Sequence, residues 1–143
     1  MLNMFSCFLA TMGFAIMFNI PRNKIIPAGI TGAIAGFVYF LVLNYSKSET
    51  TALFFASITL SLVSEVLARM LKCPATIFSI CALIPFVPGG KMYYTMLEIV
   101  ANNLNMALIN GITTIVQACA LVIGYVIISG LSHALQSLKR VHE

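Results

Sequence analysis

The chain has 143 residues, of which 60% are hydrophobic and only 8% are charged, and its formal net charge is +4. Because soluble domains carry about a quarter charged residues, this composition excludes an ordinary soluble protein and favours a lipid environment. The basic residues are scattered singly or in pairs between apolar runs, which argues against a nucleic-acid-binding surface.

Long apolar runs predict the helices, because a spanning helix needs about 20 apolar residues. The predicted helices cover residues 1–20, 25–45, 51–71, 75–100 and 106–130, and an amphipathic tail follows over 131–143. No alternating strand pattern is visible, and an open strand edge cannot face lipid. The predicted fold class is therefore all-α integral membrane, with residues 1–143 as a single transmembrane domain. The first run lacks a preceding basic residue and a cleavage site, which favours a retained helix over a signal peptide.

The second predicted helix carries small residues in the stretch AGITGAIAG, which includes Gly29, Gly32 and Gly36. Small residues at intervals of four let two helix backbones approach closely, and van der Waals contact then replaces the hydrophobic drive that lipid removes. The motif predicts a helix-packing face, and its partner could lie in this chain or in another.

The third predicted helix carries a polar stripe at a spacing of four, formed by Ser57, Ser61 and Glu65, and Arg69 continues it. A charged side chain facing lipid costs about 2–3 kcal/mol at the centre of a helix, so Glu65 should face the interior. Two interpretations stay open. Either Glu65 lines a cavity and takes part in ion or proton coupling, or the stripe is a hydrogen-bonded seam between helices.

The fourth predicted helix is interrupted by Pro85, Pro88, Gly89 and Gly90. Each proline removes a backbone donor and clashes with the preceding turn. We therefore expect one half-helix over about 76–84 and another over about 91–102. The second half-helix would present free amides and the positive end of its dipole beside Lys91, which suits a carboxylate. The alternative is a surface loop in which Lys91 extends to water.

The distribution of basic residues distinguishes a crossing segment from a re-entrant one. If residues 75–100 return to the same side, four basic residues stand against three. If they cross, six share one side and one lies opposite, so the positive-inside rule favours five spans. The break then falls near mid-membrane, with the N-terminus outside and the C-terminus inside. The six basic residues that this model places on one side are Arg22, Lys24, Arg69, Lys72, Lys139 and Arg140. The single basic residue on the opposite side is Lys47.

The fifth predicted helix has a polar stripe that includes Asn110 and Gln117, so this face should look inward. The chain has no Asp, none of the common hydrolase or phosphate-loop motifs, and no Cys-x-x-Cys pair. We therefore expect no enzyme activity, no catalytic residue, no cofactor and no metal site, with the four cysteines as small buried side chains.

Three stretches resemble the threonine/serine exporter (ThrE) family: CALIPFVPGGKMYYTM over 81–96, MGFAIMFNIPRNKIIPAGITGAIAG over 12–36, and SLVSEVLARMLKCPATIFSI over 61–80. The match is to its small, separately encoded subunit, which corresponds to the C-terminal half of the fused exporters. Cys81 departs from the small residue or proline expected at that position.

The resemblance implies a secondary exporter in the bacterial inner membrane. Its expected substrates are small amino acids of the threonine/serine type, or short carboxylates such as dicarboxylates, and its expected partner is a larger subunit of the same family. The motif carries substrate-binding candidates over to Pro85, Pro88, Gly89, Gly90 and Tyr93, whereas Lys91 and Glu65 follow from charge and depth alone. A non-transporting assembly subunit and a passive channel remain the alternatives.

Overall fold

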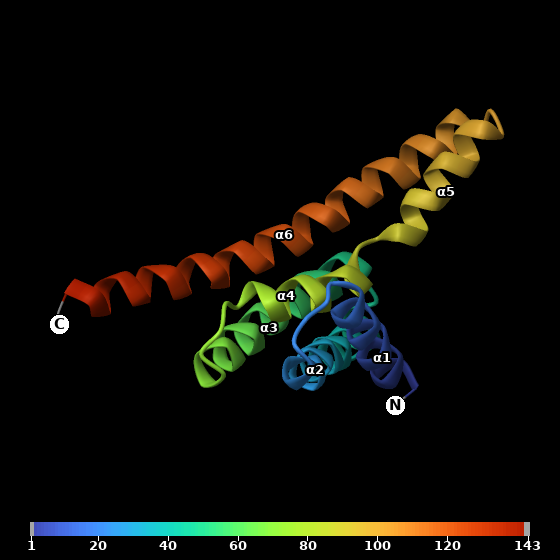
Figure 1. The fold of residues 1–143 in the computed structure, drawn as a ribbon. Coiled ribbons are helices and arrows are strands. Elements are labelled where there is room, and N and C mark those ends of the chain that lie inside the picture. Colours follow the sequence, from blue (N-terminus) through green and yellow to red (C-terminus); the bar gives the residue numbers. More distant parts are fainter. Residues whose placement is uncertain (1, 142–143) are drawn as a thin grey trace.

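The computed structural model describes the backbone of residues 2–141 and the side chains of residues 4–132 and 134. Within residues 2–141 every regular element is a helix, as the apolar runs predict (Figure 1). The elements in chain order are α1 (Leu2–Met17), α2 (Arg22–Ser46), α3 (Glu49–Met70), α4 (Thr76–Leu83), a 3₁₀ turn η1 (Ile84–Phe86), α5 (Gly89–Val100) and α6 (Leu104–Val141).

The first four helices form a bundle in which small residues bring backbones together. The glycine face of α2 lies against α1. A Cβ on Gly32 would lie 2.0 Å from Thr11 Oγ1, and a Cβ on Gly36 would lie 2.8 Å from Cys7 Sγ. A Cβ on Gly29 would lie 2.7 Å from the ring of Phe8. The small-residue motif therefore lies at a helix contact within this chain.

Two apolar clusters fill the bundle. One joins α2, α3, α4, the break and α6, and the other joins α1, α2, α3 and α4. The buried members of the first are Ala35, Leu53, Ala56, Leu60, Ala82, Phe86 and Leu121. Those of the second are Ala15, Ala28, Ala68, Phe78 and Cys81.

The chain breaks between α4 and α5 where its prolines predict. Pro85 lies in η1, where the helix tightens, and Pro88 precedes the first residue of α5. The two halves are bent by 44°. The first half-helix ends one residue earlier than expected and the second begins two residues earlier, at Gly89, because Pro88 is compatible with the position just before a helix.

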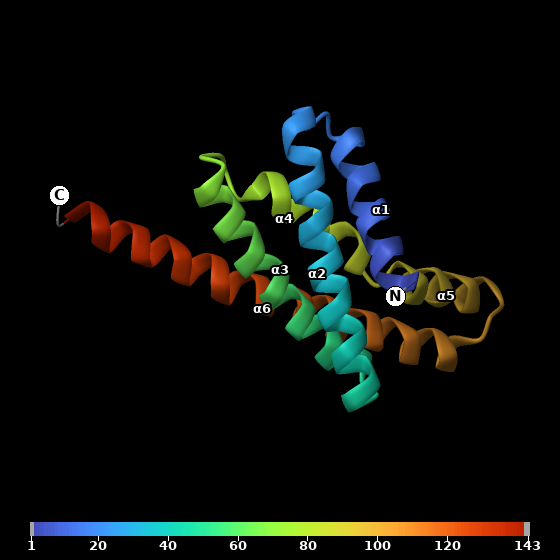
Figure 2. The same cartoon turned by 90° about the horizontal axis from the view of Figure 1, so that it is seen from below.

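Helices α5 and α6 form an antiparallel hairpin that projects beyond the bundle (Figures 1 and 2). The fifth predicted span and the tail are one continuous helix, because α6 runs to Val141. The amphipathic character expected of the tail falls almost wholly on side chains outside the described residues.

Helix α6 also packs along α3, and the two helices run in the same direction. Three contacts occur in ascending order on both helices: Gln117 with Glu49, Tyr125 with Ser61, and Ser132 with Glu65. A segment that crosses the membrane between α3 and α6 requires this parallel direction, whereas a re-entrant segment would make them antiparallel.

Three helices in the described residues are long and apolar enough to cross a membrane, over Arg22–Ser46, Glu49–Met70 and Leu104–Ser132. The broken pair α4–η1 and α5 counts as a fourth if it forms one span. Helix α1 is shorter than the predicted first span. The number of spans, the depth of the break and the orientation in the membrane stay predictions.

Candidate functional site

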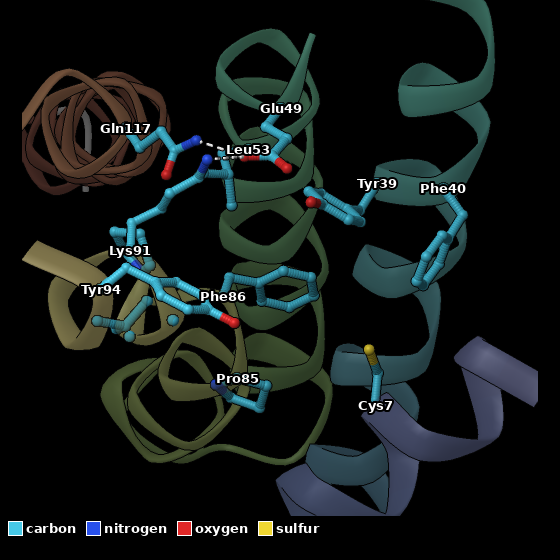
Figure 3. A pocket seen from close by; sticks show the side chains of 14 residues that line it. Cys7, Tyr39, Phe40, Glu49, Leu53, Pro85, Phe86, Lys91, Tyr94 and Gln117 are labelled. Atoms are coloured by element: carbon cyan, nitrogen blue, oxygen red, sulfur yellow. Dashed lines mark hydrogen bonds and ion pairs between the residues drawn. The ribbon is translucent and has the colours of Figure 1, made fainter. Parts of the chain in front are cut away.

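A cavity of about 500 Å³ lies at the helix break, where the bundle meets the hairpin (Figure 3). Its walls come from α1, α2, α3, the break, α5 and α6. They consist of Cys7, Tyr39, Phe40, Glu49, Leu53, Pro85, Phe86, Val87, Pro88, Gly89, Gly90, Lys91, Tyr94 and Gln117. The sequence stretch from Pro85 to Lys91 thus supplies one continuous wall.

Glu49 is the charged centre of this cavity. Its Oε2 accepts a hydrogen bond of 2.7 Å from Gln117 Nε2 and lies 3.9 Å from Lys91 Nζ (Figure 3). Gln117 is buried, whereas the Lys91 and Glu49 side chains are 38% and 51% exposed. A half-exposed ion pair of this kind contributes little to stability. Both charges therefore remain accessible to a ligand, while the buried amide holds the carboxylate in place.

Helix ends position these two charges. Glu49 is the first residue of α3, where a carboxylate interacts favourably with the positive end of the helix dipole. Lys91 is in the first turn of α5, where a cation is unfavourable. The Glu49 carboxylate offsets the unfavourable interaction of Lys91 with the dipole of α5. The two charges and the two helix ends therefore stabilise one another.

The first turn of α5 leaves room for a ligand. A Cβ on Gly89 or on Gly90 would meet no atom within 4 Å, so both glycines border open space. The Gly89 amide donates to Val87 O at 2.7 Å and the Met92 amide donates to Pro88 O at 3.1 Å. The Gly90 and Lys91 amides of this turn therefore remain as the donors nearest the cavity.

The structure brings together five of the six predicted substrate-binding residues and leaves one outside. Tyr93 does not line the cavity. Its side chain is 63% exposed on the outward face of α5, where its ring contacts the Tyr94 ring at 5.6 Å. Tyr94 occupies the cavity wall instead, because it is one helical turn beyond Lys91 and so lies on the same face.

The predicted coupling residues gather at the other end of α3. Ser132 Oγ donates to Glu65 Oε2 at 2.5 Å and accepts from Arg69 Nη2 at 3.0 Å. Glu65 and Arg69 are therefore linked through Ser132 on α6. Nearby, Ser61 Oγ donates to Tyr125 O at 3.4 Å. Glu65 is buried and borders a second cavity of about 620 Å³.

The two acidic residues lie far apart. Glu49 and Glu65 are separated by sixteen positions on α3, about 24 Å at the rise of an α-helix. Gln117 belongs to the Glu49 end, whereas half-buried Asn110 lies on α6 outside both cavities. Among the described residues, no three His, Cys, Asp or Glu side chains are grouped so that they could hold a metal ion.

Glu49 is the principal residue that the sequence did not point to, because the predicted helices over 25–45 and 51–71 leave it in the connection between them. A signal was present. The polar stripe of Ser57, Ser61 and Glu65, extended back by two steps of four residues, reaches Leu53 and then Glu49. Glu49 is also one of only 4 acidic residues in the chain.

Comparison with protein-family models identifies a family of membrane transport proteins. A protein of Haemophilus influenzae, described as uncharacterized, is 26% identical over 92 residues, which cover 64% of this chain and 31% of that protein. No solved structure matches the chain. The family model described as threonine/serine exporter, ThrE, matches residues 3–131. The chain belongs to the threonine/serine exporter family of membrane transport proteins.

Proposed function

We propose that this chain is a subunit of a secondary-active exporter of small amino acids, and that it binds its substrate in the cavity at the helix break. The observation that carries this proposal is the Glu49–Lys91 pair, held by Gln117. A free amino acid has an ammonium and a carboxylate on one carbon. Lys91 and the amides of the adjacent turn suit the carboxylate, and Glu49 suits the ammonium.

The same pair favours amino acids over dicarboxylates. A dicarboxylate brings two negative charges, and only Lys91 would meet them as a full positive charge in this cavity. Glu49 would repel the second carboxylate. Short dicarboxylates are therefore the second substrate class, to be measured beside threonine and serine.

The proposal includes a larger partner subunit in the bacterial inner membrane. The matched region is 31% of the Haemophilus influenzae protein, so most of that relative lies outside it. Transporters commonly form their substrate sites between two structurally related halves. A second half against the exposed outer face of the hairpin would complete the enclosure of the cavity.

Glu65 is proposed as the coupling residue, at a distance from the substrate. It is buried, it is hydrogen-bonded to Ser132, and it borders the second cavity. Proton uptake would turn its carboxylate from an acceptor into a donor and so change its bond to Ser132. Because Ser132 belongs to α6, this change would act on the helix that also holds Gln117.

The test is efflux of labelled threonine, serine and a short dicarboxylate from cells that make this chain and its larger partner. We expect Lys91→Ala and Glu49→Gln each to lower amino-acid efflux by roughly tenfold or more, because a charge-assisted hydrogen bond contributes about 1.5–3 kcal/mol. Lys47→Ala is the matched control. Lys47 lies in the connection between α2 and α3 and does not line the cavity.

Other outcomes identify the alternatives. Unchanged efflux in Lys91→Ala and in Gly89→Leu would refute the proposed site. Absence of any efflux above background in the wild type would favour an assembly subunit. Efflux that needs no gradient and does not saturate would favour a passive channel.

A further inference from the structure

Helix α5 has its polar face turned inward and its apolar face turned outward. Lys91, Thr95 and Glu98 follow one another at intervals of four and three and are half-buried. No residue of α5 is fully buried. Apart from Tyr94, which borders the cavity, the large residues on the rest of the helix are apolar and exposed: Met92, Tyr93, Met96, Leu97, Ile99 and Val100.

The inward face of α5 lies against α6. A Cβ on Gly111 would lie 3.5 Å from Thr95 Cγ2, which is ordinary van der Waals contact. Gln117 and Ala107 are buried on α6, and Asn110 and Thr114 between them are half-buried. Polar side chains from both helices therefore share one seam, which starts at the Lys91 end and follows the hairpin toward its turn.

These polar groups do not bind one another across the seam. Thr95 Oγ1 donates to Lys91 O at 2.8 Å, and Thr114 Oγ1 donates to Asn110 O at 2.8 Å, each within its own helix. No side-chain hydrogen bond or ion pair joins residues 89–100 to residues 104–121. A polar seam that served to hold the helices together would be bonded across them. Lys91 and Gln117 bind Glu49 of α3, and the side chains of Glu98 and Asn110 have no hydrogen-bond partner among the described residues, so they can face water or a solute.

We infer that the seam between α5 and α6 lines the route from the cavity to the hairpin turn, for a small hydrophilic solute and its water. This inference rests on the transport function proposed above. Lys91 and Glu98 are seven residues apart, about 10 Å along the helix. One further turn reaches Asn102 and Asn103, which are exposed.

The helices approach each other at Thr95 and Gly111, where a Cβ on the glycine would be in ordinary van der Waals contact with the Thr95 methyl group, and the route opens when α5 moves away from α6. Such a movement disturbs little packing, because α5 has no buried side chain. On the α6 side of the seam, Gly111 and Ala107 have no side chain or a small one, so they occupy little of the space between the helices. A modest separation is therefore enough to admit a small solute.

Cysteine labelling tests the route without any substrate. The four native cysteines are replaced by alanine, and single cysteines are introduced as Thr95→Cys, Glu98→Cys and Thr114→Cys in the seam. Leu97→Cys and Ile112→Cys on the outward faces are the matched controls. A membrane-impermeant methanethiosulfonate should label the seam positions at least about tenfold faster, because the reactive thiolate forms in water and not in hydrocarbon.

Static exposure alone gives the opposite order, since Leu97 and Ile112 are 47% and 62% exposed and the seam residues Thr95, Glu98 and Thr114 are less so. Equal rates at the two sets, or no labelling in the seam, would overturn the inference. This result does not depend on what the protein transports, so it is separable from the efflux result for Lys91→Ala.

A reversible cross-link tests the route in the working transporter. Thr95→Cys combined with Gly111→Cys places two cysteines where the helices touch. Oxidation should abolish efflux by fixing α5 to α6, and a reductant should restore it, which controls for folding. Export at an unchanged rate by the cross-linked protein would contradict the inference.

Discussion

The bundle of α1–α4 and helix α5 of the hairpin bury their side chains to different extents. The bundle buries small apolar side chains such as Ala15, Ala28 and Ala35, and it also buries polar ones such as Thr31 and Ser57. Helix α5 has no buried residue, keeps its polar side chains half-buried along the seam and turns its apolar ones outward. Lipid tails are as apolar as these side chains, so packing and polar contacts, rather than hydrophobicity, distinguish the inside from the outside.

The difference indicates that the two regions have different roles. The bundle gains stability from the close approach of helix backbones, and this stability is lost where such a contact opens. Helix α5, which carries Lys91, has no buried side chain, whereas α6, which carries Gln117, packs along α3 and places Leu121 in the core. The proposed substrate cavity lies at the boundary, where Glu49 and Gln117 of the packed region meet Lys91 of the helix that can move.

The largest contrast between the two regions should come from removing one large side chain in each. Phe78→Ala, in α4, empties a site that is fully buried. Because lipid supplies little of the transfer term, we expect mainly the cavity term, a loss of about 2–3 kcal/mol in the free energy of unfolding. Met96→Ala, in α5, should change it by less than about 0.5 kcal/mol, as at an ordinary surface position.

Denaturant titration of the purified protein in detergent micelles measures both changes. A loss for Met96→Ala as large as that for Phe78→Ala would show that the outer face of α5 is packed against protein. In the purified protein, a second copy of this chain would then cover that face, and detergent would not.

The contact that joins the two regions should give the next largest effect. A Cβ on Gly124 would lie 2.1 Å from Ser57 Oγ and 2.8 Å from Phe54 O, and the backbone oxygen cannot rotate away. Gly124→Ala should therefore cost about 1–3 kcal/mol by overpacking. A Cβ on Gly130, in the same helix, would meet nothing within 4 Å, so Gly130→Ala should stabilise by up to about 1 kcal/mol.

The two alanine variants differ in the sign of their effect, so thermal melting in detergent is enough to compare them. Gly124→Ala with a melting temperature at or above that of the wild type would mean that α6 does not press on α3 at this point. The parallel pairing of α3 and α6 would then be looser than the structure has it.

The sequence was a good guide to the fold wherever a local rule dominates. The prolines at 85 and 88 predict the break because no neighbour can replace a missing amide hydrogen. The glycines of α2 predict a close contact, although only the structure identifies α1 as the partner. The sequence did not predict that α6 continues without a break to Val141. Hydropathy detects the end of an apolar segment, and a helix can continue beyond that point.

The site was harder to predict because it depends on register and on distant neighbours. Tyr93 matches the family motif, yet α5 begins at Gly89, and this register turns Tyr93 outward and Tyr94 inward. Glu49 pairs with residues 42 and 68 positions later in the chain, and no local pattern encodes such contacts. The charge of Lys91 was informative on its own, but its counter-charge was found only in three dimensions.

The smallest effect on stability, and the most informative one for coupling, should come from Glu65→Gln. The amide keeps the size of the side chain and an oxygen that accepts from Ser132, so we expect a loss below about 1 kcal/mol in the free energy of unfolding. Glu65→Ala removes the acceptor of the Ser132 hydroxyl and should cost about 1–3 kcal/mol.

The amide of Glu65→Gln cannot take up a proton. If Glu65 couples transport to a proton gradient, this variant should lose gradient-driven efflux and keep exchange of labelled for unlabelled substrate, since exchange needs no net proton movement. Full gradient dependence in Glu65→Gln would instead assign Glu65, Ser132 and Arg69 to a structural seam. The bundle would then hold the hairpin in place at both ends of α3, and coupling would have to reside at Glu49 or in the partner subunit.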